Sequence, residues 1–376
     1  MKKRMAFIIC AVCLLFSGTS YAQTEDSEDN AVNDLYQQYT SSIPDKETEY
    51  EYMSLDDFTE KALRNDTSNK KLSSNIDLYE KQSDYYGETY SSSFSYTNLY
   101  NLLNSQNNYK NARTSKKAAE ENVKYSAKEV YAGIITDERA LVVSEASLKL
   151  NESKLNLAKA KNGLGLISDD ELAEQQQTYN QSVEDYKNKQ EALELSYQSL
   201  NTLIGENENK RYKFELPLVY EELVIDGTID TYAKAKAQAA ASVVSAEQSL
   251  DTAEQMFNIR GLNEDSTEPY NYDSLKNDIN EASLSLQDQL ESVEDSIRTL
   301  YNTIKTQESS INLNISELER LKKLYDTAEK KYEAGTANLI EVEEAKQSVV
   351  EKEYEILQEM YSHMLNVEKF GNMDLF

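Results

Sequence analysis

Apolar residues recur every seven positions along four long stretches of the chain, and the stretches form two matching sets. The first set contains Ile134, Leu141, Leu148 and Leu155, and the residues 170 positions later are Ile304, Ile311, Leu318 and Tyr325. Downstream, the spacing resumes at Leu172, Tyr179, Tyr186, Leu193 and Leu200, and again at Val342, Val349, Ile356, His363 and Phe370. Sustained heptads predict long α-helices packed as a left-handed coiled coil.

A glycine interrupts the pattern at the same place in each set. GLGLISDDELAEQ begins at Gly163 and EAGTANLIEVEEA begins at Glu333, so that Gly165 aligns with Gly335. The chain has only ten glycines and three prolines, which leaves little material for turns. Glycine can take a positive φ and end a helix, so we expect each glycine to mark the tip of an antiparallel hairpin. Ser168 and Asn338 are the expected N-caps of the return helices.

Two similar helix starts divide the chain into halves. SLDDFTEKALRN begins at Ser54 and TIDTYAKAKAQA begins at Thr228. We therefore expect an all-α fold with little or no β-structure, made of two tandem repeats of long antiparallel coiled-coil hairpins at residues 54–225 and 226–376. The long helix expected from about Leu99 to Asn162 would extend roughly 95 Å at 1.5 Å per residue.

The N-terminal residues have the pattern of a secretory signal. Three basic residues precede an apolar run from Met5 to Phe16, and small residues lead to a cleavage site after Ala22. We expect residues 1–22 to be removed and residues 23–53 to form a flexible acidic lead-in. The apolar run is too short to span a bilayer, which needs about 20 residues. Cleavage would remove Cys10 and Cys13, the chain's two cysteines.

The mature chain would be strongly acidic. Without its three N-terminal basic residues it has 36 Lys and Arg against 67 Asp and Glu, so the net charge is 36 − 67 = −31. This charge disfavours nucleic acid and anionic lipid as partners. It is typical of a soluble, elongated molecule with much surface.

No catalytic or metal-binding constellation is evident in the sequence. His363 is the single histidine and occupies a heptad position, where packing or hydrogen bonding is the expected role. One histidine cannot supply a zinc site, and the GLGL stretch lacks the strand and lysine of a phosphate-binding loop. We therefore expect a non-enzyme without cofactor or metal.

The tandem halves, each with a Tyr/Asn-x-x-Gly-x-x-Ser/Asn-x-x-Glu-Leu/Val tip, resemble the TolC-type outer membrane efflux family. The resemblance covers nearly all of the chain after Ser54. It implies a homotrimer that forms a hollow helical barrel, whose tips meet a periplasmic adaptor protein and an inner-membrane or ABC-type pump.

The resemblance also implies roles for residues near the tips. Those similar to the family's adaptor-docking turns are Leu164, Gly165, Leu166, Ala334, Gly335 and Thr336. Glu341 and Glu344 match acids that ring the family's entrance and bind cations, and Glu171 and Tyr332 match a polar link in its closed state. The arginine of that closing network is replaced by Ala337, which predicts a weaker or different latch. Compensation of the helix N-terminus is an equally good interpretation of these acids.

The chain departs from the family where membrane strands are expected. The family inserts two strands in each half to build a twelve-stranded β-barrel, and a membrane strand needs roughly 9–11 residues. The corresponding junctions are only Tyr85–Asn101, long enough for a small hairpin, and Phe257–Leu275, which has the composition of a loop. Direct insertion into a membrane is therefore doubtful.

Two functional classes fit these patterns. One is a TolC-like component of an export assembly that forms or scaffolds an extracytoplasmic helical duct. The alternative is a helical rod, spacer or adhesin at the cell surface without a transport role. A near-equal duplication favours the duct, because repeated hairpins can close a cylinder. Either protein would lie in the cell envelope, at the outer membrane or periplasm of a two-membrane host or at the surface of a one-membrane host.

Overall fold

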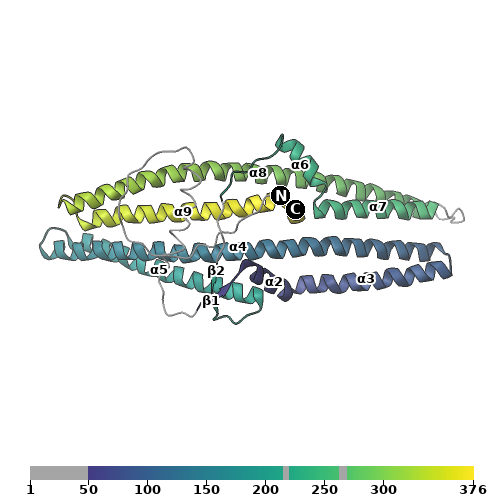
Figure 1. Ribbon diagram of the computed structural model, residues 1–376, viewed down its shortest axis with the longest axis horizontal. Coiled ribbons are helices and arrows are strands. Elements are labelled where there is room, and N and C mark those ends of the chain that lie inside the picture. The colour runs from purple at the N-terminus through teal and green to yellow at the C-terminus, as the bar shows by residue number, and fades with distance from the viewer. Residues whose placement is uncertain (1–49, 215–219, 262–268) are drawn as a thin grey trace, which may run out of the picture.

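The computed structural model describes residues 50–214, 220–261 and 269–376 of the chain. These residues form an elongated bundle whose long helices run along one axis (Figure 1). The turns at 164–168 and 334–338 lie at one end of the molecule, and the connection at 93–95 lies at the opposite end. The expected signal peptide and residues 23–49 of the expected lead-in lie outside the described residues.

The first repeat contains one long helix flanked by shorter ones. Its elements are β1 (Tyr50–Met53), α2 (Leu55–Asn65), α3 (Thr67–Ser92), α4 (Tyr96–Gly163), α5 (Asp169–Ile204) and β2 (Arg211–Phe214). Ser54 caps α2 through a hydrogen bond from the Asp57 N–H, as the sequence predicts. Asp66 separates α2 from α3, because its side chain caps α3 by accepting from the Asn69 N–H at 2.6 Å.

The second repeat contains the same helices in the same order. They are α6 (Ile229–Ala237), α7 (Ala241–Gly261), α8 (Pro269–Glu333) and α9 (Leu339–Gly371), followed by the 3₁₀ turn η1 (Met373–Leu375). Thr228 caps α6 by accepting from the Thr231 N–H, which confirms its prediction as a helix start. The all-α repeat architecture expected from the heptads is therefore confirmed.

The two longest helices set the dimensions of the molecule. α4 has 68 residues and α8 has 65, so that each is about 100 Å long at 1.5 Å per residue. Most of their heptad residues lie in the core, with Ile134, Ile304 and Ile311 each at 0% exposure. Leu141, Leu148 and Tyr325 are half-buried. Long amphipathic helices of this kind are stable because a continuous apolar stripe is buried along their length.

A short parallel strand pair was not expected from the sequence. β1 pairs with β2 in the register Tyr50 to Arg211 through Met53 to Phe214. The buried Tyr131 side chain of α4 donates to the Met53 carbonyl at 2.8 Å and holds the pair against the bundle. The last four residues of the expected flexible lead-in are therefore ordered, because they find partners far away in the sequence.

The junction between α3 and α4 also differs from the expectation. A small strand hairpin was possible within Tyr85–Asn101, but both helices continue to a three-residue connection at 93–95. Ser95 caps α4 by accepting from the Asn98 N–H, and the Asn98 side chain donates to the Ser93 carbonyl at 2.8 Å. These capping hydrogen bonds stabilise a direct connection between α3 and α4 in place of a strand hairpin. The seven residues 262–268 at the corresponding junction lie outside the described residues, so the loop expected there is only partly described.

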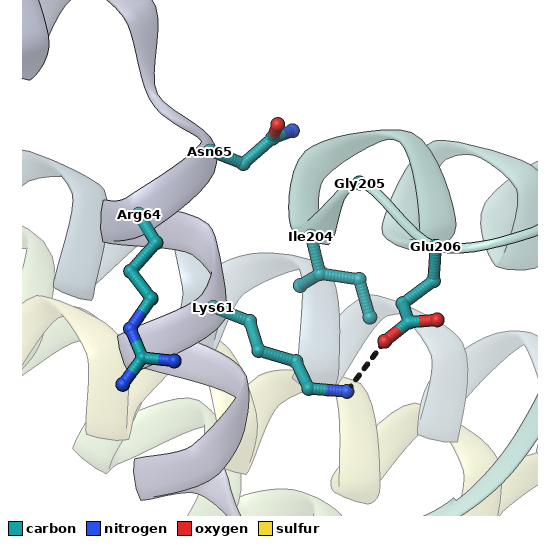
Figure 2. Close-up of a pocket in the computed structure, with 6 residues that line it drawn as sticks. All are labelled: Lys61, Arg64, Asn65, Ile204, Gly205 and Glu206. Carbon is teal, nitrogen blue, oxygen red and sulfur yellow. Dashed lines mark hydrogen bonds and ion pairs between the residues drawn. The ribbon is translucent and has the colours of Figure 1, made fainter.

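The end of α5 is joined to α2 around a shallow depression of about 200 Å³, shown in Figure 2. The Lys61 ammonium lies 2.7 Å from a Glu206 carboxylate oxygen. Asn65 donates to the Thr202 and Leu203 carbonyls at 3.0 Å, which satisfies the end of α5. Gly205 turns the chain with φ 70°. These contacts are all within the protein, so we interpret the depression as a structural joint.

Among the described helices, none combines the length and apolar character needed to cross a membrane.

Candidate docking site at the hairpin tips

The two glycine turns lie at the same end of the bundle, where α4 leads into α5 and α8 leads into α9 (Figure 1). Each turn is five residues long, comprising 164–168 in the first repeat and 334–338 in the second. Sequence positions 170 residues apart are thus brought to neighbouring places in space. We call these turns with their flanking residues the first tip (162–171) and the second tip (332–344).

The first tip is closed by paired backbone hydrogen bonds. The Leu166 N–H donates to the Lys161 carbonyl at 2.9 Å and the Gly165 N–H donates to the Asn162 carbonyl at 2.8 Å. This pairing is the Schellman arrangement, which needs a left-handed residue at its centre. Gly165 supplies that residue with φ 72°, as the sequence predicts.

The second tip repeats this geometry. The Thr336 N–H donates to the Lys331 carbonyl at 2.8 Å, and the Gly335 N–H donates to the Tyr332 carbonyl at 2.9 Å. Gly335 has φ 69°. A Cβ atom added to either tip glycine would meet no atom within 4 Å, so the requirement for glycine is one of backbone conformation and not of space.

The tips expose apolar side chains. Leu164 is 75% exposed and Leu166 is 69% exposed. Ala334 and Thr336 are exposed at the matching positions of the second tip, where Leu339 is also about half exposed. These side chains project from a chain with net charge −28, so each tip is a small apolar knob on an acidic molecule. The six residues expected to dock an adaptor are therefore accessible.

Glu171 and Glu341 are both used to start helices. Ser168 and Glu171 form a capping box, in which the Ser168 N–H donates to the Glu171 carboxylate at 2.8 Å and the Glu171 N–H donates to the Ser168 hydroxyl at 3.2 Å. The Glu341 N–H likewise donates to the Asn338 side chain at 3.1 Å. Hydrogen bonds from the Ser168 backbone and hydroxyl lower the pKa of Glu171. Within one protomer both acids thus have the geometry of helix caps.

Glu344 joins the two repeats, whereas no hydrogen bond joins Tyr332 to Glu171 among the described residues of this protomer. The Glu344 carboxylate lies 2.7 Å from the Lys154 ammonium of α4. Tyr332 is 46% exposed on α8, whereas the Glu171 carboxylate is bound to Ser168. The polar link expected between Glu171 and Tyr332 has no counterpart in the hydrogen bonds described for this protomer.

The site has the features of a binding surface. Among residues 50–214, 220–261 and 269–376, no cluster of three or more His, Cys, Asp or Glu side chains could hold a metal ion. The tips combine turns closed by backbone hydrogen bonds, exposed apolar side chains and acids in the first turns of α5 and α9. Such a surface can bind another protein through apolar contacts bordered by charge.

Two tip residues received no separate role in the sequence analysis. Asn162 donates to the Ile167 carbonyl at 3.3 Å and to the Asp169 carboxylate at 3.0 Å, so it braces the first tip from inside. Leu339 adds exposed apolar surface beside the second turn. The sequence could have pointed to Asn162, because it occupies the Tyr/Asn position of the tip motif. No sequence pattern marked Leu339 as exposed, because leucine side chains are more often buried.

The fold is similar to those of several solved outer membrane proteins. The outer membrane protein VceC from Vibrio cholerae matches with TM-score 0.60 and 12% identity over 85% of this chain and 96% of that one. CusC, whose structures concern folding and transmembrane channel formation, matches with TM-score 0.61 and 11% identity over 89% and 94% of the two chains. A membrane protein from Pseudomonas aeruginosa matches with TM-score 0.58 and 12% identity over 89% and 99%.

The chain has a TolC-like fold. The likeness spans nearly the whole length of these proteins, so both repeats and both tips belong to the shared architecture. No protein-family model matches the sequence, and no curated protein matches it. At 11–12% identity the TolC-like fold is shared while the side chains are largely this protein's own.

Proposed function

We propose that this protein is a TolC-like component of an export assembly, which forms or scaffolds a helical duct outside the cytoplasm and docks an adaptor protein through its two tips. The observation that carries the proposal is the pair of matching tips at one end of a molecule about 100 Å long, each with exposed apolar residues on a Schellman turn. A spacer has no need of two such surfaces side by side.

The partner that fits the tips is a protein with an α-helical hairpin, as in adaptors of the membrane fusion type. Leu164 and Leu166 are knobs of the size that packs into the hole between two helices. The surrounding acids Asp169, Asp170 and Glu171 would select a partner surface with few acids of its own. An inner-membrane or ABC-type pump would supply the energy, because the proposed duct conducts passively.

Assembly as a homotrimer would place three copies of each tip around one axis. Six hairpins can then close a cylinder in which each helix stripe is covered by a neighbour. Glu341 and Glu344 would form an acidic ring near the opening. Tyr332 and Glu171 would form a latch only if contacts between copies replace the hydrogen bond that Glu171 makes to Ser168 within one protomer. The envelope location follows from the proposed export role.

Photocrosslinking in living cells tests the docking proposal. A photoreactive residue replaces Leu166 or Thr336, and the captured partner is identified by mass. The matched control replaces Leu313, which is 72% exposed on α8 away from the tips. We expect capture of a hairpin adaptor from both tips and not from Leu313. Capture of wall material alone, or of other copies of this chain alone, would favour a helical spacer.

Substitutions at the tips provide a second test. Gly165→Arg and Gly335→Arg have room for a side chain, and we expect them to fold while export is lost. Leu166→Arg and Thr336→Arg add the same charge at the neighbouring positions, where the backbone φ is not positive. Leu313→Arg is the control for added charge. Folded tip variants with unchanged export would refute the docking role.

A further inference from the structure

The end of the molecule opposite the tips is uncharged over one long stretch. From Thr89 to Tyr109 the chain contains no Asp, Glu, Lys, Arg or His, although 28% of all residues are charged. This stretch includes the end of α3, the connection 93–95 and the start of α4 (Figure 1). This part of the α3–α4 hairpin is therefore uncharged, although the molecule as a whole is highly acidic.

Aromatic side chains gather at this end. Phe94 at the apex is 66% exposed, Tyr85 is 64% exposed and Tyr100 is about half exposed. The Phe94 ring contacts that of Tyr90, with centroids 5.5 Å apart. We call the surface formed by Tyr90, Phe94 and Tyr100 the aromatic end. Tyrosine has an apolar ring and a polar hydroxyl, and it is enriched where apolar and aqueous layers meet.

Three small polar residues near the end of α3 are already hydrogen-bonded within the helix. The hydroxyls of Thr89 and Ser91 donate to the Tyr85 and Gly87 carbonyls at 2.8 Å, and the Ser92 hydroxyl donates to the Thr89 carbonyl at 3.0 Å. Leaving water is costly mainly for polar groups that lack a partner. This end can thus be moved out of bulk water at lower cost than its serine content suggests.

We propose that the aromatic end binds the headgroup layer of a zwitterionic lipid bilayer. The contact is shallow, because Glu88 lies five residues before Ser93 on α3, which is about 7 Å along the helix. That depth is within the roughly 5–10 Å to which the apolar face of an interfacial helix enters a membrane. An anionic bilayer is disfavoured by the net charge of −28.

The proposal is independent of adaptor docking. The tips and the aromatic end lie at opposite ends of the bundle (Figure 1), so either surface can function without the other. An end that contacts lipid would orient the long axis away from the membrane and present the tips about 100 Å from it. Failure of vesicle binding would leave the tip experiments unaffected, and failure of crosslinking would leave this proposal unaffected.

The absence of tryptophan from the chain makes a direct test possible. Phe94→Trp places one fluorophore at the apex, and Leu313→Trp places one at a similarly exposed position on the side of α8. Each full-length variant is mixed with phosphatidylcholine vesicles. We expect the emission of Phe94→Trp to shift to shorter wavelength and to be quenched by brominated phosphatidylcholine, while Leu313→Trp does not respond.

A loss-of-binding variant completes the test. Phe94→Ser should lower vesicle partitioning about tenfold, because a buried phenylalanine side chain is removed, and Leu313→Ser should not. Both variants carry the same N-terminal segment, so any binding through that segment is common to them. Adding phosphatidylglycerol at low salt should weaken binding.

Three results would overturn the proposal. The first is an unchanged Phe94→Trp spectrum with vesicles. The second is an equal response of both reporters, which would indicate adsorption without a preferred surface. The third is a Phe94→Trp shift that depends on protein concentration without lipid, which would assign the aromatic end to contact with a second copy. Circular dichroism confirms that each variant is folded.

Discussion

The return helices α5 and α9 have the same heptad pattern but very different surroundings. All five heptad residues of α9 are buried, whereas in α5 only Leu200 is buried and Leu172, Tyr179, Tyr186 and Leu193 are half-buried. The reason is that α9 packs against both α8 and α4, while along most of its length α5 packs against α4 alone. The same local pattern thus produces a core helix in one repeat and a surface helix in the other.

This difference indicates where further copies would pack. The half-buried stripe of α5 keeps apolar surface that the protomer does not cover, and the proposed ring of copies would cover it. In α9 the same stripe is already used to hold the repeats together. The difference between the two helices therefore separates residues needed for folding from residues available for assembly.

The largest effect is expected from truncating equivalent heptad positions. Ile356→Ala removes a side chain that is 3% exposed, and we expect it to lower the free energy of unfolding by about 2–5 kcal/mol. Tyr186→Ala at the equivalent position of α5 should cost the protomer about 1 kcal/mol or less, since part of that ring is in water. Urea unfolding followed by circular dichroism measures both. Equal losses would mean that α5 is buried as deeply as α9.

The glycines at the ends of the two return helices should respond in opposite ways. Gly205 has φ 70° and an added Cβ would lie 3.0 Å from the Asn65 side chain, so Gly205→Ala should destabilise the protein by about 1–3 kcal/mol. Gly371 is helical and has open space beside it, so Gly371→Ala should be neutral or slightly stabilising. Thermal melts of the two variants, compared at equal concentration, test the contrast.

A pH effect is expected from α9 alone, where His363 stands in place of Leu193. His363 is 2% exposed and faces Glu308 and Lys305 of α8, with Tyr220 and Glu222 from the segment before α6. Burial lowers the pKa of His363, and the hydrogen bond to Glu308 only partly opposes this. The unfolded chain therefore takes up the proton more readily than the folded one.

The sign of the effect follows from that difference. Stability should fall as pH drops through the usual histidine range near 6.5 and should level off below the folded pKa, with a slope of at most about 1.4 kcal/mol per pH unit. His363→Leu, which copies the residue of the first repeat, should remove this slope between pH 7.5 and 5.5, a window chosen around the ordinary pKa of about 6.5. Urea midpoints across that range measure it. An unchanged slope in the variant would assign the pH dependence to other groups.

The smallest effect is expected for the ion pair that joins the repeats near the tips. Lys154 and Glu344 are both partly exposed, and pairs of this kind contribute about 0.2–1 kcal/mol. A double-mutant cycle of Lys154→Ala and Glu344→Ala should give a coupling in that range and should weaken in high salt. The pair Lys187–Glu184 within α5 is the control, because it joins no second element.

Much of the fold and of the candidate site was predictable from residues close together in the sequence. Helix starts at Ser54, Ser168 and Thr228, the left-handed glycines of the tips and the heptad stripes all depend on hydrogen bonds or spacings within a few residues. Exposure of Leu164 and Leu166 followed from their place between two helices. The expected link between Glu171 and Tyr332 joins separate hairpins, and no local pattern could establish it.

The sequence by itself determined the two repeats, the long helices and the shape of each tip, because their stabilising contacts are local and recur with a fixed period. Only the tertiary structure decided that 50–53 pairs with β2, that α3 turns directly into α4, and that Lys154 meets Glu344. It also decided which return helix is buried. These outcomes depend on contacts between distant segments, and a heptad stripe specifies that it will be covered without specifying by which neighbour.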